Sequence, residues 1–144
     1  PPLTGEHTFT VNVHEVNAAP VLAAIGAKSV NEGSALSFTV NAGDPNDTPA
    51  NTVTLSATGL PAGATFDPAT GAFAWTPGET QQGAHQVTFT ATDGGVPPQS
   101  VSETVTITVA EVNAAPAFTE VIPPQSVNEG TLLTLTNLVA DADL

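Results

Sequence analysis

Cysteine is absent from the 144 residues, so neither disulfides nor thiolate zinc sites can stabilise the chain. Lysine and arginine together contribute 1 residue, against 14 acidic residues. Such a surface repels phosphate backbones and anionic membranes, which excludes nucleic acid as a partner. No apolar run has the length of a membrane-spanning helix, so we expect no membrane insertion. No charged-then-apolar signal segment opens the chain, which predicts a mature or excised segment.

The motifs that carry enzyme chemistry are also missing. The sequence contains no Gly-x-Ser-x-Gly nucleophile motif and no phosphate-binding glycine loop with a lysine. Of the 3 histidines, His7 and His14 have opposite parity on one predicted strand, so they would face opposite sides of it. We therefore expect no enzymatic activity, no catalytic residue and no organic cofactor.

The most informative feature that is present is an internal repeat. Residues 97–116 match residues 1–20 without a gap, and Asn17 recurs 96 residues later as Asn113. The pentapeptide Ser-Val-Asn-Glu-Gly occurs at 29–33 and, 97 residues later, at 126–130. The repeat predicts the last strand and linker of a preceding unit at 1–17, a complete unit at 18–113, and the first strands of a following unit at 114–144.

Inside the complete unit, apolar residues alternate with threonine and serine at a period of two, which is typical of strands with one buried face. The inward positions are expected to be Leu36, Phe38, Val40, Val53, Leu55, Ala57, Val87, Phe89, Ala91, Val105, Ile107 and Val109. The run Asp-Pro-Ala-Thr-Gly at 67–71 predicts a tight turn between two brief strands. About seven short strands and no helix predict an all-β sandwich with Phe66, Phe73 and Trp75 at its centre.

These strands and turns also carry a family resemblance. The segments 59–63, 67–71, 76–77 and 87–93, together with Gly83, make the chain similar to the bacterial Putative Ig repeat and to its relative, the dystroglycan-type cadherin-like domain. The resemblance implies an immunoglobulin-like or cadherin-like Greek-key sandwich, in tandem on large extracellular or cell-surface adhesins. It also implies calcium at the junctions between repeats, and it does not imply an activity.

Acidic residues gather at the two ends of the predicted sandwich. Counting Glu129, 10 of the 14 acids fall in loops and linkers at predicted junctions. Two like charges about 4 Å apart repel by roughly 4 kcal/mol at an effective dielectric near 20, so clusters without lysine or arginine need a cation. Calcium accepts Asp, Glu, Asn and carbonyl oxygens together from flexible loops and is the expected ion.

The resemblance implies a calcium ligand set for each junction. At the downstream junction the ligands would be Glu32, Glu111, Asn113, Asp141 and Asp143. At the upstream junction they would be Glu15, Asn17, Asp44, Asn46 and Asp93. Ala18 and Ala114 stand where many calcium linkers carry another Asp, which predicts lowered affinity. The alternative is that these acids are solvated turn residues that bond their own backbone.

The predicted function is that of a structural spacer or adhesion repeat of a secreted or cell-surface protein, stiffened by calcium. Its partners would be neighbouring repeats of the same chain, with lateral or head-to-tail self-association as a further option. One alternative is a carbohydrate-binding sandwich, which would need a solvent-facing Trp75 or Phe73 to stack on a glycan. Another is the subunit repeat of an extracellular filament or matrix, formed through threonine-rich strand faces.

Overall fold

The computed structural model describes residues 4–12, 16–136, 138–141 and 143. Its strands are β1 (Val21–Leu22), β2 (Lys28–Asn31), β3 (Leu36–Thr39), β4 (Ala42–Gly43), β5 (Val53–Thr58), β6 (Thr65–Asp67), β7 (Ala72–Trp75), β8 (Gly83–Asp93), β9 (Ser100–Ala110), β10 (Ala117–Phe118) and β11 (Val139–Ala140). No helix occurs in these described ranges, and therefore none there could cross a membrane.

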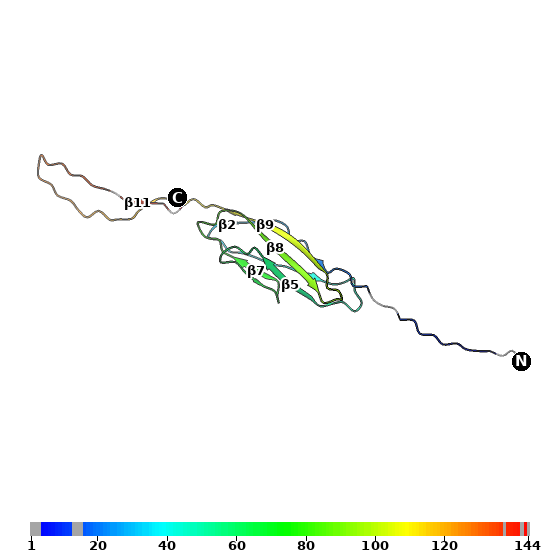
Figure 1. Ribbon diagram of the computed structural model, residues 1–144. Coiled ribbons are helices and arrows are strands. Elements are labelled where there is room, and N and C mark those ends of the chain that lie inside the picture. The colour runs from blue at the N-terminus through cyan, green and yellow to red at the C-terminus, as the bar shows by residue number, and fades with distance from the viewer. Residues whose placement is uncertain (1–3, 13–15, 137, 142, 144) are drawn as a thin grey trace.

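Strands β1 to β9 form a sandwich of two layers (Figure 1). One layer is a four-stranded sheet in the order β2-β9-β8-β5, and the other is a three-stranded sheet in the order β3-β7-β6. The short β1 pairs with β4, which directly follows β3 and so extends the second layer. The prediction of an all-β, immunoglobulin-like or cadherin-like sandwich is confirmed.

Strands β8 and β9 are longer than the short strands that the sequence pattern predicts. Each has 11 residues, and they pair antiparallel from Gly83 opposite Val109 to Thr92 opposite Ser100. The alternation of apolar and hydroxyl residues runs through both segments without a turn residue, so nothing breaks the pairing. This hairpin spans most of the length of the sandwich (Figure 1).

The core lies between the layers and contains the residues predicted to point inward. Phe89 is fully buried, and its ring centroid lies 5.8 Å from that of Phe38, 5.3 Å from Phe66 and 6.0 Å from Phe73. Phe73 is 1% exposed and Trp75 is 2% exposed. Because both rings are core residues, neither supplies the exposed aromatic surface that the carbohydrate-binding alternative needs.

The predicted turn at 67–71 is present between β6 and β7. The carboxylate of Asp67 accepts hydrogen bonds from the Ala69 amide (2.9 Å) and the Thr70 hydroxyl (2.7 Å). Gly71 has a φ of 71°, and its amide donates to the Asp67 carbonyl at 2.8 Å. The turn therefore needs both the short acceptor side chain of Asp67 and a glycine at its end.

The first two strands, β1 and β2, pair in different sheets. β1 pairs with β4, whereas β2 pairs in parallel with β9. Gly26, with a φ of 69°, lies at the crossover between them. The Glu103 carboxylate accepts hydrogen bonds from the amides of Ile25 (3.0 Å) and Gly26 (2.8 Å), so a side chain of β9 fastens the crossover.

This contact predicts how the stability of the sandwich changes in acid. Hydrogen bonds from the Ile25 and Gly26 amides hold the pKa of Glu103 below its ordinary value of 4.5. A carboxyl whose pKa is lower in the folded state contributes stability above its unfolded pKa and loses it as pH falls through the folded pKa. We expect Glu103→Gln to be less stable than wild type at pH 7, and the difference to shrink below about pH 4.5.

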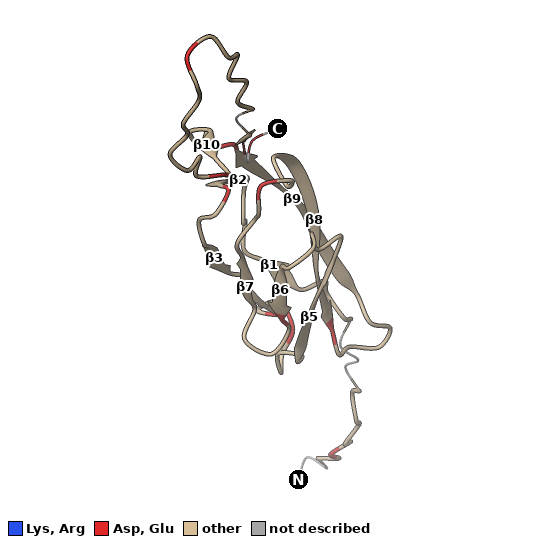
Figure 2. Ribbon diagram, turned by 90° about the vertical axis from the view of Figure 1, so that its left-hand side faces the viewer, with Lys and Arg blue, Asp and Glu red and all other residues tan. Residues whose placement is uncertain are grey.

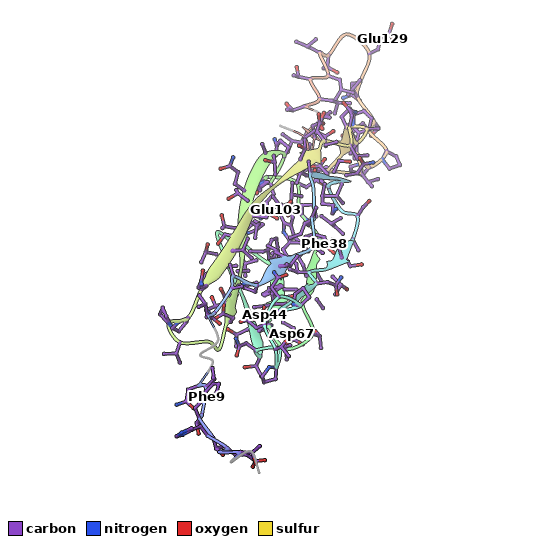
Figure 3. The ribbon with its side chains drawn as sticks, turned by 90° about the vertical axis from the view of Figure 1, so that its right-hand side faces the viewer. Phe9, Phe38, Asp44, Asp67, Glu103 and Glu129 are labelled. Atoms are coloured by element: carbon purple, nitrogen blue, oxygen red, sulfur yellow. The ribbon has the colours of Figure 1, made fainter. Side chains whose placement is uncertain are left out.

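Urea unfolding at several pH values measures this difference in the free energy of unfolding. Glu129→Gln is the matched control, because Glu129 lies exposed at the far tip of the downstream segment (Figure 3). The interpretation is wrong if Glu103→Gln and wild type keep a constant difference from pH 7 into the acid range.

The two flanking segments differ in what they pair with. Residues 4–12 form no strand, and Phe9 is 83% exposed in the extended upstream segment (Figure 3). Downstream, β10 and β11 pair with Ala117 opposite Ala140, as β1 and β4 pair with Val21 opposite Gly43. Since a strand needs neighbours to bury its apolar face, the exposure of Phe9 is expected of a segment without its own sheet.

Candidate metal centres at the two ends of the sandwich

Acidic residues lie mainly toward the two ends of the sandwich (Figure 2). We call the group at the end where the following segment begins the downstream cluster: Glu32, Glu79, Glu111 and Asp143. We call the group at the opposite end, where the preceding segment enters, the upstream cluster: Asn17, Asp44, Asp47, Asn51 and Asp93.

Glu32 is the buried centre of the downstream cluster. It follows β2, where its own amide still continues the parallel ladder by donating to the Ala110 carbonyl at 2.9 Å. Its side chain is only 6% exposed, although it is a carboxylate. Oε1 accepts a hydrogen bond from the Val112 amide at 2.8 Å, but Oε2 is buried and has no donor among the described residues. A buried carboxylate oxygen without a partner is costly, so this atom is suited to bind a cation.

Two other acids meet Glu32 at this end. One carboxylate oxygen each from Glu32, Glu111 and Asp143 lie within 4.8 Å of one another. Glu111 directly follows β9, and Asp143 comes from the following segment. Asp143 Oδ2 accepts a hydrogen bond from the Ala114 amide, and its Oδ1 is buried without a donor in the described structure. The cluster thus joins the sandwich, the linker and the next segment.

Glu79 is a fourth acid at this site. The charge of Glu32, burial, and the charges of Asp143 and Glu111 raise its pKa above the ordinary value. The ligand set implied by the family resemblance did not contain Glu79. The carboxylates here repel one another. Lys28 is the single lysine or arginine of the chain, and its ammonium group donates to the Ile25 carbonyl instead of to these acids.

The arrangement fits one hard divalent cation. Calcium lies about 2.3–2.6 Å from its ligand oxygens, so oxygens on opposite sides of one ion are about 5 Å apart. The 4.8 Å limit on the separations among Glu32, Glu111 and Asp143 is consistent with this geometry. Without a cation, each pair at that distance repels by roughly 3–4 kcal/mol at an effective dielectric near 20.

The upstream cluster is built differently, because amide donors satisfy most of its carboxylate oxygens. Asn17 Nδ2 donates to Asp93 at 3.1 Å, and Asn51 Nδ2 donates to Asp47 at 2.6 Å and to Asn17 Oδ1 at 2.8 Å. Burial acts to raise the pKa of Asp93, but hydrogen bonds from the Gln99 and Gly95 amides and from Asn17 outweigh it and leave the pKa lowered. These bonds fasten the linker to the sandwich directly.

Asp44 is the exception in the upstream cluster. It is 5% exposed, and neither of its carboxylate oxygens has a donor among the described residues. Burial, followed by the charges of Asp47 and Asp93, raises its pKa above the ordinary value. Asp44 therefore has two unpartnered buried oxygens where Glu32 has one, but it lies in a cluster whose other carboxylates already accept hydrogen bonds.

Asp47, like Glu79 and Asn51, is a site residue that the predicted ligand set did not contain. Its Oδ1 accepts a hydrogen bond from the Ala18 amide at 3.0 Å, as Asp143 accepts one from the Ala114 amide. Ala18 and Ala114 are 96 residues apart, and so are Asp47 and Asp143. At the offset of 97 residues that separates the two Ser-Val-Asn-Glu-Gly pentapeptides, Asn46 aligns with Asp143, but Asn46 lies exposed. Applying the linker's offset of 96 residues to the loop would have predicted Asp47 as the counterpart of Asp143.

The other predicted ligands, Glu15, Asp141 and Asn113, differ in their surroundings. Glu15 lies outside the described residues. Asp141 accepts a hydrogen bond from the Asp143 amide at 3.2 Å and so lies beside the downstream cluster. Asn113 is exposed, and its side-chain amide donates to the Ala114 carbonyl at 3.0 Å.

Comparison with known proteins extends the description of the fold. A family model described as Putative Ig domain matches residues 19–110. No curated protein sequence matches the chain. Among solved structures, human CDH23 EC21-23 is similar at 24% identity and a TM-score of 0.57, over 86% of this chain and 46% of that one.

Two further structures share the fold. The protocadherin GammaB4 extracellular domain has 23% identity and a TM-score of 0.53, over 86% of this chain and 23% of its own. A nucleoside hydrolase-related hypothetical protein from Saccharophagus degradans, associated with carbohydrate metabolism, has 16% identity and a TM-score of 0.54, over 65% and 26%. The chain spans less than half the length of each of the three structures, so the likeness concerns the fold.

Proposed function

The chain belongs to the Putative Ig domain family, and from this premise we propose that it is a spacer or adhesion repeat of an extracellular or cell-surface protein whose junctions are stiffened by calcium. In this proposal residues 18–113 are one unit of a tandem array, flanked by parts of its neighbours at 1–17 and 114–144. The unit acts mechanically and not as an enzyme. Its partners are the adjoining repeats.

The observation that carries this proposal is the downstream cluster. Glu32 belongs to the sandwich, Glu111 to the linker and Asp143 to the following segment, and their carboxylates converge within 4.8 Å. Each of Glu32 and Asp143 keeps one buried oxygen without a donor in the described structure. A cation bound to all three would hold the following segment at a fixed angle to the sandwich, because it links groups that otherwise repel.

The upstream cluster supports a second, weaker site at the preceding junction. Asp44 offers two buried oxygens without donors among the described residues, and Asp47 and Asp93 lie close enough to raise its pKa. Amide hydrogen bonds already occupy much of Asp47 and Asp93, so an ion there would gain fewer free oxygens. We propose that calcium fills the downstream cluster first.

Small-angle X-ray scattering of the whole chain tests the mechanical role. With millimolar calcium we expect a single extended shape, and with chelator a broader distribution of distances, because the following segment then moves about the linker. Asp143→Asn should give the broad distribution in both conditions, whereas Asp67→Asn, at a turn that lies within the sandwich, should behave as wild type. Identical scattering of wild type with calcium and with chelator would remove the stiffening role.

A further inference from the structure

The outer face of the four-stranded sheet has an unusual composition. The outward positions of β2, β5, β8 and β9 are occupied, in these described strands, by serine, threonine, asparagine, glutamine and alanine alone. No charged or aromatic side chain points outward from them, because Lys28, His85, Asp93 and Glu103 occupy inward positions of the alternation. We call this surface the hydroxyl face.

Strand register orders the hydroxyls into cross-strand rows. Ser56 on β5 lies opposite Thr90 on β8, which lies opposite Ser102 on β9. The rows on either side are built in the same way, since the pairs two residues away along each strand also face outward. Neighbouring strands are about 4.8 Å apart and alternate residues about 6.6–6.8 Å apart, so the face is a regular grid of hydroxyl groups.

Hydrogen bonds hold these side chains in fixed orientations. Thr90 and Ser102 share a hydroxyl–hydroxyl bond of 2.8 Å. Thr88 with Thr104 (2.9 Å) and Thr92 with Ser100 (2.8 Å) do the same in the adjoining rows. In each pair, one hydroxyl hydrogen forms this bond. The other hydroxyl hydrogen can donate outward, and the unused oxygen lone pairs can accept. The face therefore offers donors and acceptors together, with little side-chain entropy left to lose on contact.

A second copy of this chain is the occupant that fits such a surface. The chain carries a net charge of −13, so copies repel wherever their acids approach, and the hydroxyl face is free of those charges. A surface that both donates and accepts is complementary to itself about a two-fold axis. The outward positions of the described strands of this sheet carry no charge that would repel a second copy. The absence of aromatic rings disfavours a sugar ligand.

We propose that two copies of the repeat associate laterally through their hydroxyl faces. Strand spacing and rise give an area of about 500 Å² for three strands over the length of β9, so a pair would bury about 1,000 Å² in total. That is below the size of stable interfaces, so each contact is weak and reversible. The contact itself needs no calcium. Several aligned repeats would strengthen the association by raising the effective concentration of each further contact, and this part rests on the proposed tandem array.

Sedimentation velocity of the whole chain, in chelator and over a rising concentration series, tests the proposal. We expect wild type to show a concentration-dependent increase in sedimentation coefficient. Thr90→Glu places two like charges against each other at the centre of the paired faces and should weaken association about tenfold or more. Thr90→Val keeps the β-branched shape and removes the hydroxyl, and it should also weaken association.

The matched control is Ala74→Glu, at the middle of β7. Ala74 faces outward from the central strand of the other sheet, between Ser37 and Thr65, so the variant has the same charge and a comparable strand position. It should associate as wild type does, and circular dichroism should show that all variants are folded. The proposal is overturned if wild type stays monomeric throughout, or if Ala74→Glu weakens association as much as Thr90→Glu. Because chelator is present, failure of the calcium proposal does not affect this result.

Discussion

Glu32→Gln is expected to lower the affinity of the downstream cluster for calcium by about tenfold or more, because affinity follows the number of charged ligands. The substitution keeps an Oε1 that can accept the hydrogen bond from the Val112 amide, so the loop should remain in place. It replaces the buried Oε2, which has no donor among the described residues, with an amide nitrogen, which cannot bind a cation. Calorimetric titration of the whole chain with calcium measures the change.

The same variant has opposite effects on stability with and without the ion. In chelator, Glu32→Gln should be as stable as wild type or more so, since it removes repulsion with Glu79, Glu111 and Asp143. Calcium at one hundred times its dissociation constant stabilises wild type by about 2.7 kcal/mol, and a tenfold weaker site by about 1.4 kcal/mol. Glu120→Gln, the same substitution in an exposed part of the flanking segment, should leave both values unchanged. Equal calcium-induced gains in Glu32→Gln and wild type would contradict the site.

Gly71→Ala is expected to destabilise the sandwich by about 3 kcal/mol or more. Part of the loss comes from the φ of 71°, which costs about 1–3 kcal/mol in a residue with a side chain. The rest comes from position, because a Cβ on Gly71 would lie 2.1 Å from the carbonyl oxygen of Val40. The Val40 amide donates to the Gly71 carbonyl at 2.8 Å, so the two backbones cannot separate without losing that bond.

Gly63→Ala measures the cost of the positive φ without the cost of the close contact. Gly63 has a similar φ of 81°, but a Cβ there would have no atom within 4 Å. Urea unfolding of both variants should show a clearly larger loss for Gly71→Ala. If the two losses are equal, the close approach of Val40 contributes nothing and only the backbone conformation matters.

The calcium proposal and the hydroxyl face together describe how an array of such repeats could be organised. Acidic residues lie mainly toward the ends of the sandwich (Figure 2), where a shared cation could join them to the next unit, and the outward positions of the four-stranded sheet are uncharged. Because like charges repel strongly at the ends without calcium, the calcium proposal has the ion control the angle between units. Lateral contacts depend on hydroxyl groups and should persist in chelator.

The sequence by itself determined the layers of the fold and the side chains that fill the space between them. A strand has a side-chain period of two, so the alternation of Val, Ile and Phe with Thr and Ser decides which residues face the core wherever the strand lies. Turn chemistry is equally local, and the turn from Asp67 to Gly71 was predicted from its own five residues. The repeat likewise placed the acids at the ends of the unit.

Only the tertiary structure decided which distant groups meet. Three such contacts join residues about 50–80 positions apart. They are the parallel pairing of β2 with β9, the hydrogen bond from the Gly26 amide to Glu103, and the proximity of Glu79 to Glu32. No periodic pattern in the sequence predicts them. Asp47 takes the place predicted for Asn46 because this position of the loop follows the linker's offset of 96 residues and not the offset of 97 of the Ser-Val-Asn-Glu-Gly pentapeptide. Such contacts depend on how the two sheets close around the core, which local preferences do not specify.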